Sequence, residues 1–232
     1  MMRFIPFFIV FLFSLSQAAV AKPLTPHQQV EQVTQTLISV IEQTRDSYKT
    51  DPDSYYEGID RLLSPVIDFP SFTRSVMGVY GTREYYQSLP DAAAREQYRK
   101  DYQRFVETFK TALVQTYAKG MLAFNGQTIT IEPPSKEDAQ LIAQQEMVDV
   151  VQHIVSGADN YRITYKMRPD KSGEWLLRNV IIESVNVGQL YRNQFAAAMD
   201  KYQQNFAQVV DHWVTESAQA IEQIKEKATD DI

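Results

Sequence analysis

The residues that most often carry out chemistry in proteins are scarce in this sequence. It has no cysteine and only three histidines, His27, His153 and His212. They fall in three different predicted elements, and none has a second histidine or a carboxylate at a spacing that binds a metal ion. Asp149 comes four residues before His153, but within a strand this spacing forms no chelating pair. We therefore predict no metal site, no thiol catalysis and no redox chemistry.

Acidic residues beside apolar segments could in principle form the paired carboxylates of a glycosidase. Three residues qualify, Asp68, Asp149 and Glu183, but their spacing does not place any two of them across a cleft. The GxSxG motif of serine hydrolases, a phosphate-binding glycine loop and the GxGxxG motif are all missing from the sequence. We expect no enzymatic activity and assign no catalytic residue.

The charge balance argues against further classes of function. The formal net charge is −6, and it becomes 22 − 29 = −7 if Arg3 is removed with a leader peptide. An acidic chain without a strong basic cluster is poorly suited to bind nucleic acid or an anionic membrane surface. We expect no nucleic-acid partner.

The first residues have the pattern of an export signal. A positive start at Arg3 precedes an apolar run, Phe4 to Leu15, and the small residues before Lys22 fit a cleavage signal. The apolar run is too short to anchor the protein in a membrane. We predict a signal peptide at residues 1–21 that is cleaved after Ala21.

The remaining chain has the length of one domain. Residues 22–232 contain no internal repeat and no low-complexity linker. We predict a single domain, whose last residues after about residue 220 are frayed, and we expect it to be a monomer.

Helical spacing of apolar residues dominates the first half of the chain. A first helix starts at Thr25, and a second, short helix ends near Pro65. Asp68 to Tyr80 is a third segment, rich in apolar and aromatic residues. A long helix begins at Asp91 and ends before Asn125, which precedes a glycine.

The second half is predicted to form a sheet and a final helix. Short turns between strand-like runs indicate an antiparallel meander. The runs are Gln127–Glu132, Leu141–Val155, Tyr161–Arg168 and Glu174–Val185. A last helix runs from Leu190 to about Lys225. The predicted fold class is α+β, a four-stranded antiparallel sheet that is covered by long helices and encloses an apolar pocket.

The last predicted strand carries apolar residues on both faces, whereas a strand at the surface of a sheet normally alternates. One face has Trp175, Leu177, Ile181 and Val185, and the other has Leu176, Val180 and Ile182. Both faces must therefore be covered, either by packed core or by the wall of a cavity. Thirteen Tyr, twelve Phe and seven Met residues supply the large side chains that either alternative needs.

A basic row, Arg162, Lys166 and Arg168, alternates with apolar residues on the preceding strand. This pattern is typical of the solvated face of an antiparallel sheet. The functional alternative is contact with an anionic headgroup or a protein partner.

Several blocks, in order, resemble the MlaC family of periplasmic phospholipid-binding proteins, also called toluene-tolerance auxiliary proteins. The blocks are Asp68-Phe69 with Val76–Tyr80; Glu96–Phe105 with Leu113, Thr116–Ala118 and Gly126-Gln127; and Trp175, Val180 and Glu183–Val185 with Tyr191–Phe195. Three positions depart from the family pattern: Asn179 stands where Asp is usual, Ser184 where Gly is usual, and Asn186 where Ser is usual.

The resemblance implies a periplasmic carrier without a cofactor, whose cargo is a phospholipid. Such proteins hold the acyl tails inside the domain and move the lipid between two complexes. One is an outer-membrane lipoprotein–porin complex, and the other is an inner-membrane ABC transporter with an MCE-domain protein. The alternatives are an envelope adaptor with a fully packed core, and a lipid-modifying hydrolase.

We expect the pocket for the acyl tails to be lined by residues of the Asp68–Tyr80 segment, of the two long helices and of the sheet with its exit into the last helix. These are Phe72, Val76, Met77, Tyr80, Phe105, Phe109, Tyr117, Val148, Val150, Ile163, Tyr165, Val180, Ile182, Val187 and Tyr191. Arg74 and Arg192 are the candidates for contact with the headgroup.

Overall fold

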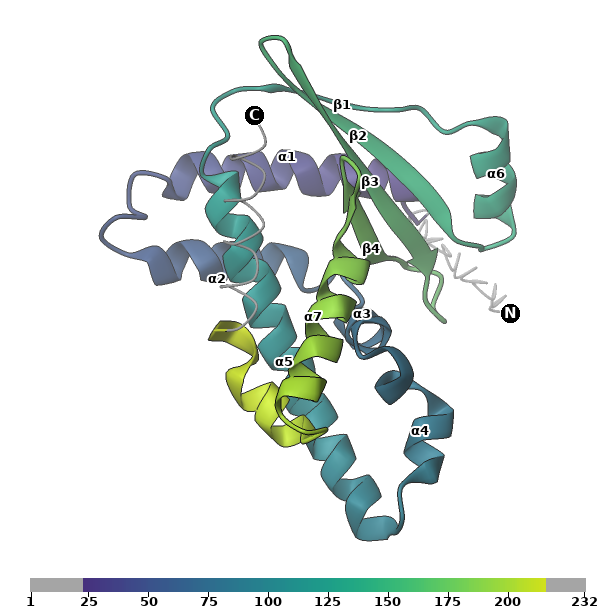
Figure 1. Ribbon diagram of the computed structural model, residues 1–232. Helices are drawn as coiled ribbons and strands as arrows, with labels where there is room; N and C mark the ends of the chain where they lie inside the picture. Colours follow the sequence, from purple (N-terminus) through teal and green to yellow (C-terminus); the bar gives the residue numbers. More distant parts are fainter. Residues whose placement is uncertain (1–22, 216–232) are drawn as a thin grey trace, which may run out of the picture.

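Helices surround one antiparallel sheet in this protein. The computed structural model describes residues 23–215, so the predicted signal peptide and the predicted frayed end lie outside the described residues. The sheet forms one half of the molecule, and a group of helices extends away from it (Figure 1). The predicted α+β fold class is confirmed.

The helices begin where the sequence places capping residues. Thr25 caps α1 through a capping box with Gln28, and Asp68 and Asp91 accept backbone hydrogen bonds at the starts of α3 and α5. The helices are α1 (Pro26–Thr44), α2 (Pro52–Leu63), α3 (Phe69–Val76), η1 (Gly78–Gly81, a 3₁₀ turn), α4 (Arg83–Ser88), α5 (Ala92–Met121), α6 (Lys136–Ala143) and α7 (Val187–Lys201).

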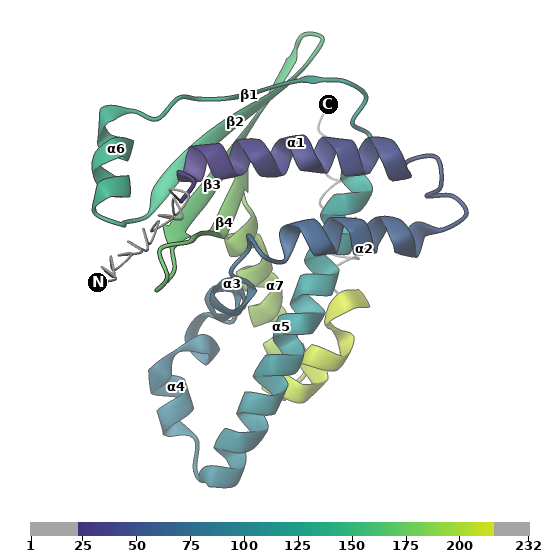
Figure 2. The same ribbon diagram turned by 180° about the vertical axis from the view of Figure 1, so that it is seen from behind.

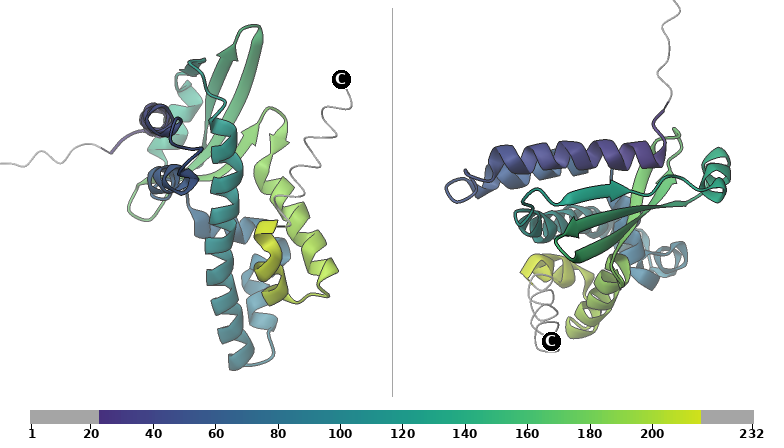
Figure 3. Two further views of the ribbon diagram at one scale, coloured as in Figure 1. Left: turned by 90° about the vertical axis from the view of Figure 1, so that its left-hand side faces the viewer. Right: turned by 90° about the horizontal axis from the view of Figure 1, so that it is seen from above.

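The strands pair in sequence order, each antiparallel to the next. They are β1 (Thr128–Ile131), β2 (Val148–Ser156), β3 (Asp159–Pro169), β4 (Trp175–Ile182) and β5 (Val185–Asn186). Helix α1 lies across one face of the sheet, which we call the inner face (Figures 2 and 3). The opposite, outer face carries the basic row of β3 in register with Asp149 and His153 of β2.

A β-bulge in β4 explains why both of its faces looked apolar in the sequence. Lys166 of β3 pairs with Asn179, whereas the next residue, Met167, pairs with Leu177. Arg178 is therefore an extra residue, which shifts the alternation by one position. Leu177, Val180 and Ile182 all line the same cavity as a result. The predicted division of this strand into two apolar faces was wrong at this point.

Three other segments differ from the predicted pattern. Residues 141–143 belong to α6, because Ser135 and Asp138 form a capping box that starts a helix, and β2 begins only at Val148. Helix α4 was not predicted, although Thr82 caps it. The sheet has a fifth strand, β5, in addition to the four that were predicted. It has two residues, and it forms because the chain folds back on β4 after a tight turn at Glu183, whose φ is 54°.

The predicted terminal helix is interrupted. Helix α7 ends at Lys201, and Gln203 and Gln204 have φ values of 51° and 64°, which an α-helix does not accommodate. Asn205 then accepts a hydrogen bond from the Gln208 N–H and starts a second helical stretch over residues 206–215. The turn folds this stretch back so that Trp213 packs edge-on against Phe105, with ring centroids 5.0 Å apart.

The buried apolar residues form three clusters rather than one core. The largest joins α3, α5, α7 and residues 206–215, a second lies between α1 and the sheet, and a third joins α1 and α2 to the end of α5. Each cluster has its own tightly packed centre, at Phe105, Val150 and Tyr55 respectively, all with 0% exposure. The space between the clusters is where a cavity can form.

Two of the three departures from the family pattern contact each other. The Asn179 Nδ2 donates to the Asn186 Oδ1 at 2.9 Å, and the Asn179 Oδ1 accepts from the Gly188 N–H at 2.9 Å. The Asn186 Oδ1 also accepts from the Gln189 N–H at 3.0 Å, which caps α7. This pair of amides fixes the angle at which α7 leaves the sheet.

Asn179→Asp should destabilise the protein by roughly 1–3 kcal/mol, because a carboxylate oxygen would face the Asn186 Oδ1 with no proton between them. Asn186 could turn its amide to donate, but the Gln189 N–H would then lose its acceptor. Adding Asn186→Ser should restore most of the loss, because a serine hydroxyl can donate to the carboxylate and still cap the helix. Urea unfolding of both single variants and the double variant measures this coupling; additive effects would contradict it.

Candidate functional site

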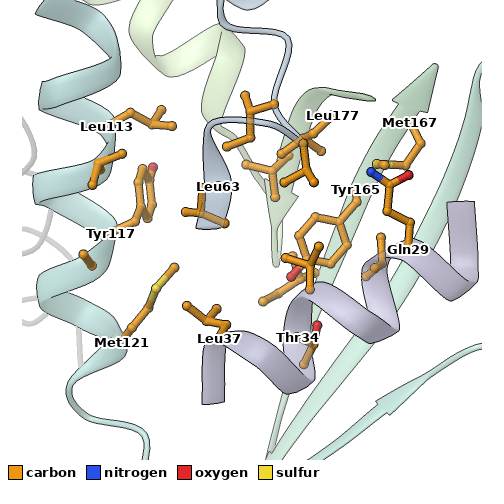
Figure 4. Close-up of a pocket in the computed structure, with 18 of the residues that line it drawn as sticks. Gln29, Thr34, Leu37, Leu63, Leu113, Tyr117, Met121, Tyr165, Met167 and Leu177 are labelled. Carbon is orange, nitrogen blue, oxygen red and sulfur yellow. The ribbon is translucent and has the colours of Figure 1, made fainter. Parts of the chain in front are cut away.

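A cavity lies at the meeting point of the three clusters. Its volume is about 180 Å³. Helix α1 and α5 form two walls, the inner face of β3 and β4 forms a third, and residues 63–67 close the space between α2 and α3. Figure 4 shows Leu113, Tyr117 and Met121 of α5 facing Leu37 of α1 across this space.

The lining is almost entirely apolar. Its polar side chains are Gln29, Thr34, Tyr117 and Tyr165. The Tyr165 hydroxyl donates to Gln152 Oε1 at 2.6 Å, which leaves the ring as the part of the side chain that faces the cavity. No lining residue carries a formal charge at neutral pH.

The two tyrosines are poorly suited to acid–base chemistry. Burial raises the pKa of Tyr117 to about 12, and burial raises the pKa of Tyr165 further above its ordinary value. Both hydroxyls therefore stay protonated at neutral pH. The lining holds no histidine or carboxylate that could accept their protons, and its apolar surface suits the binding of an apolar molecule.

Six of the fifteen residues that the sequence singled out for the pocket line this cavity. They come from α3, α5, β3 and β4, and the cavity brings their side chains together. They are Phe72, Tyr117, Ile163, Tyr165, Val180 and Ile182. Their role as contacts for acyl tails stays a prediction.

The other nine residues lie outside the cavity lining. Most are packed against one another, because the apolar stripes of α3, α5 and α7 face each other below the cavity. Val148 and Val150 lie on the inner face of β2, where Trp175 and Val30 cover them. The nine are Val76, Met77, Tyr80, Phe105, Phe109, Val148, Val150, Val187 and Tyr191.

Neither candidate for headgroup contact reaches the cavity. Arg192 donates from Nε to the Ser75 carbonyl oxygen at 2.8 Å and from Nη2 to the Ser75 Oγ at 2.9 Å. The guanidinium of Arg74 lies over the ring of Tyr102, 5.3 Å from its centroid. These contacts tie α7 to α3 and α3 to α5, and neither arginine is among the lining residues.

The sequence reasoning missed the contribution of α1 and of the segment after α2. Val30, Val33 and Leu37 line the cavity from α1, and Val66 and Ile67 line it from the segment. The helical spacing of the α1 residues was a usable signal, but spacing alone does not tell which face of the sheet a helix covers. The segment also pairs with β4: the Asp68 N–H donates to the Leu177 carbonyl oxygen, and the Leu177 N–H donates to the Val66 carbonyl oxygen. The sequence could not reveal this pairing.

The titratable residues that first drew attention have structural partners. Asp68 caps α3 and forms an ion pair with Arg178, and Asp149 forms one with Lys166. The Glu183 carboxylate accepts a hydrogen bond from the Arg162 N–H. These three carboxylates are therefore not assembled across a cleft.

The histidines are equally dispersed. The His153 Nε2 lies 2.8 Å from the Glu132 Oε1, and the His212 Nδ1 lies 2.8 Å from the Gln208 carbonyl oxygen. His27 is buried, and burial lowers its pKa from the ordinary value. Within residues 23–215, no group of three or more His, Asp or Glu side chains could hold a metal ion.

No helix between residues 23 and 215 is both long and apolar enough to cross a membrane.

Comparisons with known proteins agree on one family. The family model described as "MlaC protein" matches residues 31–215. The toluene tolerance protein ttg2D of Pseudomonas putida is 32% identical over 198 residues, which cover 84% of this chain and 83% of that protein. The intermembrane phospholipid transport system binding protein MlaC of Haemophilus influenzae is 23% identical over 215 residues, or 88% of this chain and 92% of that protein.

A solved structure has the same fold. It is that of a phospholipid-binding protein from Ralstonia solanacearum in complex with a phospholipid. The TM-score is 0.66 and the sequence identity is 20%, and the match covers 85% of this chain and 99% of the other.

Proposed function

We propose that this chain, which belongs to the MlaC family, is a carrier that holds the acyl tails of a phospholipid in the cavity between α1, α5 and the inner face of the sheet. The observation that carries the proposal is a cavity whose lining is almost entirely apolar and carries no charged residue. The family relatives whose names and titles refer to phospholipids support the choice of cargo.

The free energy of transferring hydrocarbon into water explains why a lipid carrier needs an apolar cavity. Each methylene removed from water contributes about 0.8 kcal/mol, so two ordinary acyl chains amount to tens of kcal/mol. A carrier must offer the tails an environment close to that of the bilayer, or the lipid will not leave the membrane. Side chains such as Phe72, Leu113, Met121, Met167 and Leu177 offer such an environment, and methionine adapts to chains of different shape.

The size of the cavity adds a requirement. A volume of about 180 Å³ is below the roughly 300–1,000 Å³ of sites that hold drug-sized ligands. Acyl tails therefore need the walls of the cavity to separate. Because the cavity lies between three separately packed clusters, its walls can separate without breaking the centre of any cluster.

The cellular role follows from the same proposal. A signal peptide cleaved after Ala21 would deliver the mature protein to the periplasm. There a monomer without a cofactor would carry phospholipid between an outer-membrane lipoprotein–porin complex and an inner-membrane ABC transporter with an MCE-domain protein. A fully packed envelope adaptor would not need the cavity described here.

Extraction of purified mature protein with organic solvent, followed by mass spectrometry, tests the proposal. We expect about one equivalent or more of phospholipid per protein, and uptake of labelled phospholipid from liposomes by delipidated protein. The absence of phospholipid from the extract together with no uptake from liposomes would refute the carrier function. Hydrolysis products that accumulate with time would instead indicate an enzyme.

A further inference from the structure

A groove lined by arginines and tyrosines lies on the helices that extend away from the sheet. We call it the arginine groove and define it by Arg74, Arg83, Arg99, Tyr86, Tyr98 and Tyr102. Its volume is about 490 Å³. It lies beside α4 and the first half of α5, at the end of the molecule opposite the sheet in Figure 1.

The groove and the cavity are separate sites. They share no lining residue. The lining residues that lie nearest in sequence are Phe72 of the cavity and Arg74 of the groove, which are two residues apart in α3 and therefore on opposite sides of that helix. A lipid headgroup attached to tails in the cavity is therefore not the natural occupant of the groove.

The groove is positively charged although the chain as a whole is acidic, with a formal net charge of −6. Arg99 forms an ion pair with Glu96. Arg74 and Arg83 form no ion pair with any residue between 23 and 215, and both residues are exposed. Two positive charges in the groove thus lack a carboxylate, which favours an anionic occupant.

The floor of the groove is rigid. The Tyr98 hydroxyl donates to the Tyr80 carbonyl oxygen at 2.7 Å, and the Tyr102 hydroxyl donates to the Pro70 carbonyl oxygen at 2.8 Å. The two rings are stacked, with an interplanar angle of 10°. Arg74 lies on the Tyr102 ring, so its guanidinium is held in place before anything binds.

An exposed apolar residue stands beside the charged groove. Val79 is 69% exposed, more than any other large apolar residue between 23 and 215. It belongs to the turn η1, where the close approach of Gly81 to the Arg74 carbonyl oxygen permits only glycine, because a Cβ at Gly81 would lie 2.3 Å from that oxygen. The turn therefore holds Val79 in a fixed position next to the groove.

We propose that the arginine groove and Val79 form a docking surface for an acidic segment of a partner protein. Arginine and tyrosine are the residues most enriched at the energetic centres of protein interfaces, and Val79 supplies an apolar anchor beside them. A membrane fits less well, because the patch presents a single large aliphatic side chain that could enter a bilayer. The surface acts independently of lipid binding.

Titration of ¹⁵N-labelled mature protein tests this proposal. The probe is a peptide of roughly ten residues, mostly glutamate with two leucines, and its glutamine counterpart is the control for charge. We expect the acidic peptide to shift the amide signals of Val79 and Arg83 and the glutamine peptide to shift neither. Arg74→Glu combined with Arg83→Glu should weaken binding roughly tenfold or more. Lys171→Glu, which changes the charge as much as either single substitution but lies in the exposed turn between β3 and β4, should leave the affinity within about twofold.

Two further probes separate the possible occupants. If inorganic phosphate or phosphatidylglycerol vesicles produce the same shifts and displace the peptide, the groove is a general anion or membrane site and the proposal is wrong. Equal losses of affinity in the Lys171 control and the double variant would refute it as well. The phospholipid content of both variants should match the unmodified protein, so failure here is distinguishable from failure of the carrier function.

Discussion

Val180→Trp should deprive the protein of phospholipid while leaving its fold intact. Val180 lines the cavity from β4, opposite Tyr165 of β3. An indole there would occupy much of a space of about 180 Å³, in a position where a strand tolerates an aromatic residue. We expect phospholipid in the extract to fall to less than roughly a tenth of the unmodified level, because the loss of a few methylene contacts already weakens binding by that factor.

The neighbouring residue provides a matched control. Ile181 lies on the outer face of the same strand, in register with Thr164, so Ile181→Trp adds the same side chain on the opposite side of the sheet. Its phospholipid content should stay close to normal. Circular dichroism and thermal unfolding must show both variants folded. If Val180→Trp retains its phospholipid, or if both variants lose it equally, the lipid does not occupy this cavity.

Phe105→Ala should have the opposite effect, a large loss of stability with little change in phospholipid bound per folded protein. Phe105 is 0% exposed, and its ring contacts those of Phe109, Phe195, Phe206 and Trp213. Removing a buried phenylalanine ring costs about 3–5 kcal/mol, which corresponds to a fall in Tm of roughly 10 °C for a chain of this length. Urea unfolding monitored by tryptophan fluorescence measures the change, since Trp213 packs directly on the lost ring.

Two results would contradict this account of Phe105. A loss below about 1 kcal/mol would mean that the ring is not packed as described. A selective loss of phospholipid at unchanged stability would mean that the tails extend into the lower helices, as the sequence suggested for this residue. Val79→Ala is the control for truncating an apolar side chain that is not buried. It should change the free energy of unfolding by less than about 0.5 kcal/mol, because the Val79 side chain is exposed.

The elements of the fold were largely predictable because they depend on local signals. Thr25 and Asp91 mark helix starts through their capping side chains, and the alternation around Ile163 identifies β3. The break after Lys201 was not predictable, since no glycine or proline stands there and the turn is held by Gln203 and Gln204 in the left-handed region. That turn depends on where the following helix packs, which is tertiary information.

The candidate site was predictable only in part, for a related reason. Alternation grouped Ile163 with Tyr165 on β3 and Val180 with Ile182 on β4, and all four line the cavity, but the bulge in β4 meant that alternation put Leu177 on the wrong face. The aromatic residues on one face of α5 lie in two different environments. Tyr117 lines the cavity, whereas Phe105 and Phe109, up to three turns earlier, are packed against α7 and residues 206–215. Periodicity identifies an apolar face but not which partner covers each turn of it.

Arg178 lengthens β4 by one residue without changing which face of the sheet the residues before and after it point to. Without it, the strand would read Trp175-Leu176-Leu177-Asn179-Val180-Ile181-Ile182, which alternates regularly between the two faces. Deleting this residue would therefore preserve every buried position while removing the ion pair with Asp68. A one-residue gap at this place in a sequence alignment would consequently signal the loss of a link between sheet and α3, and not a change of the cavity wall.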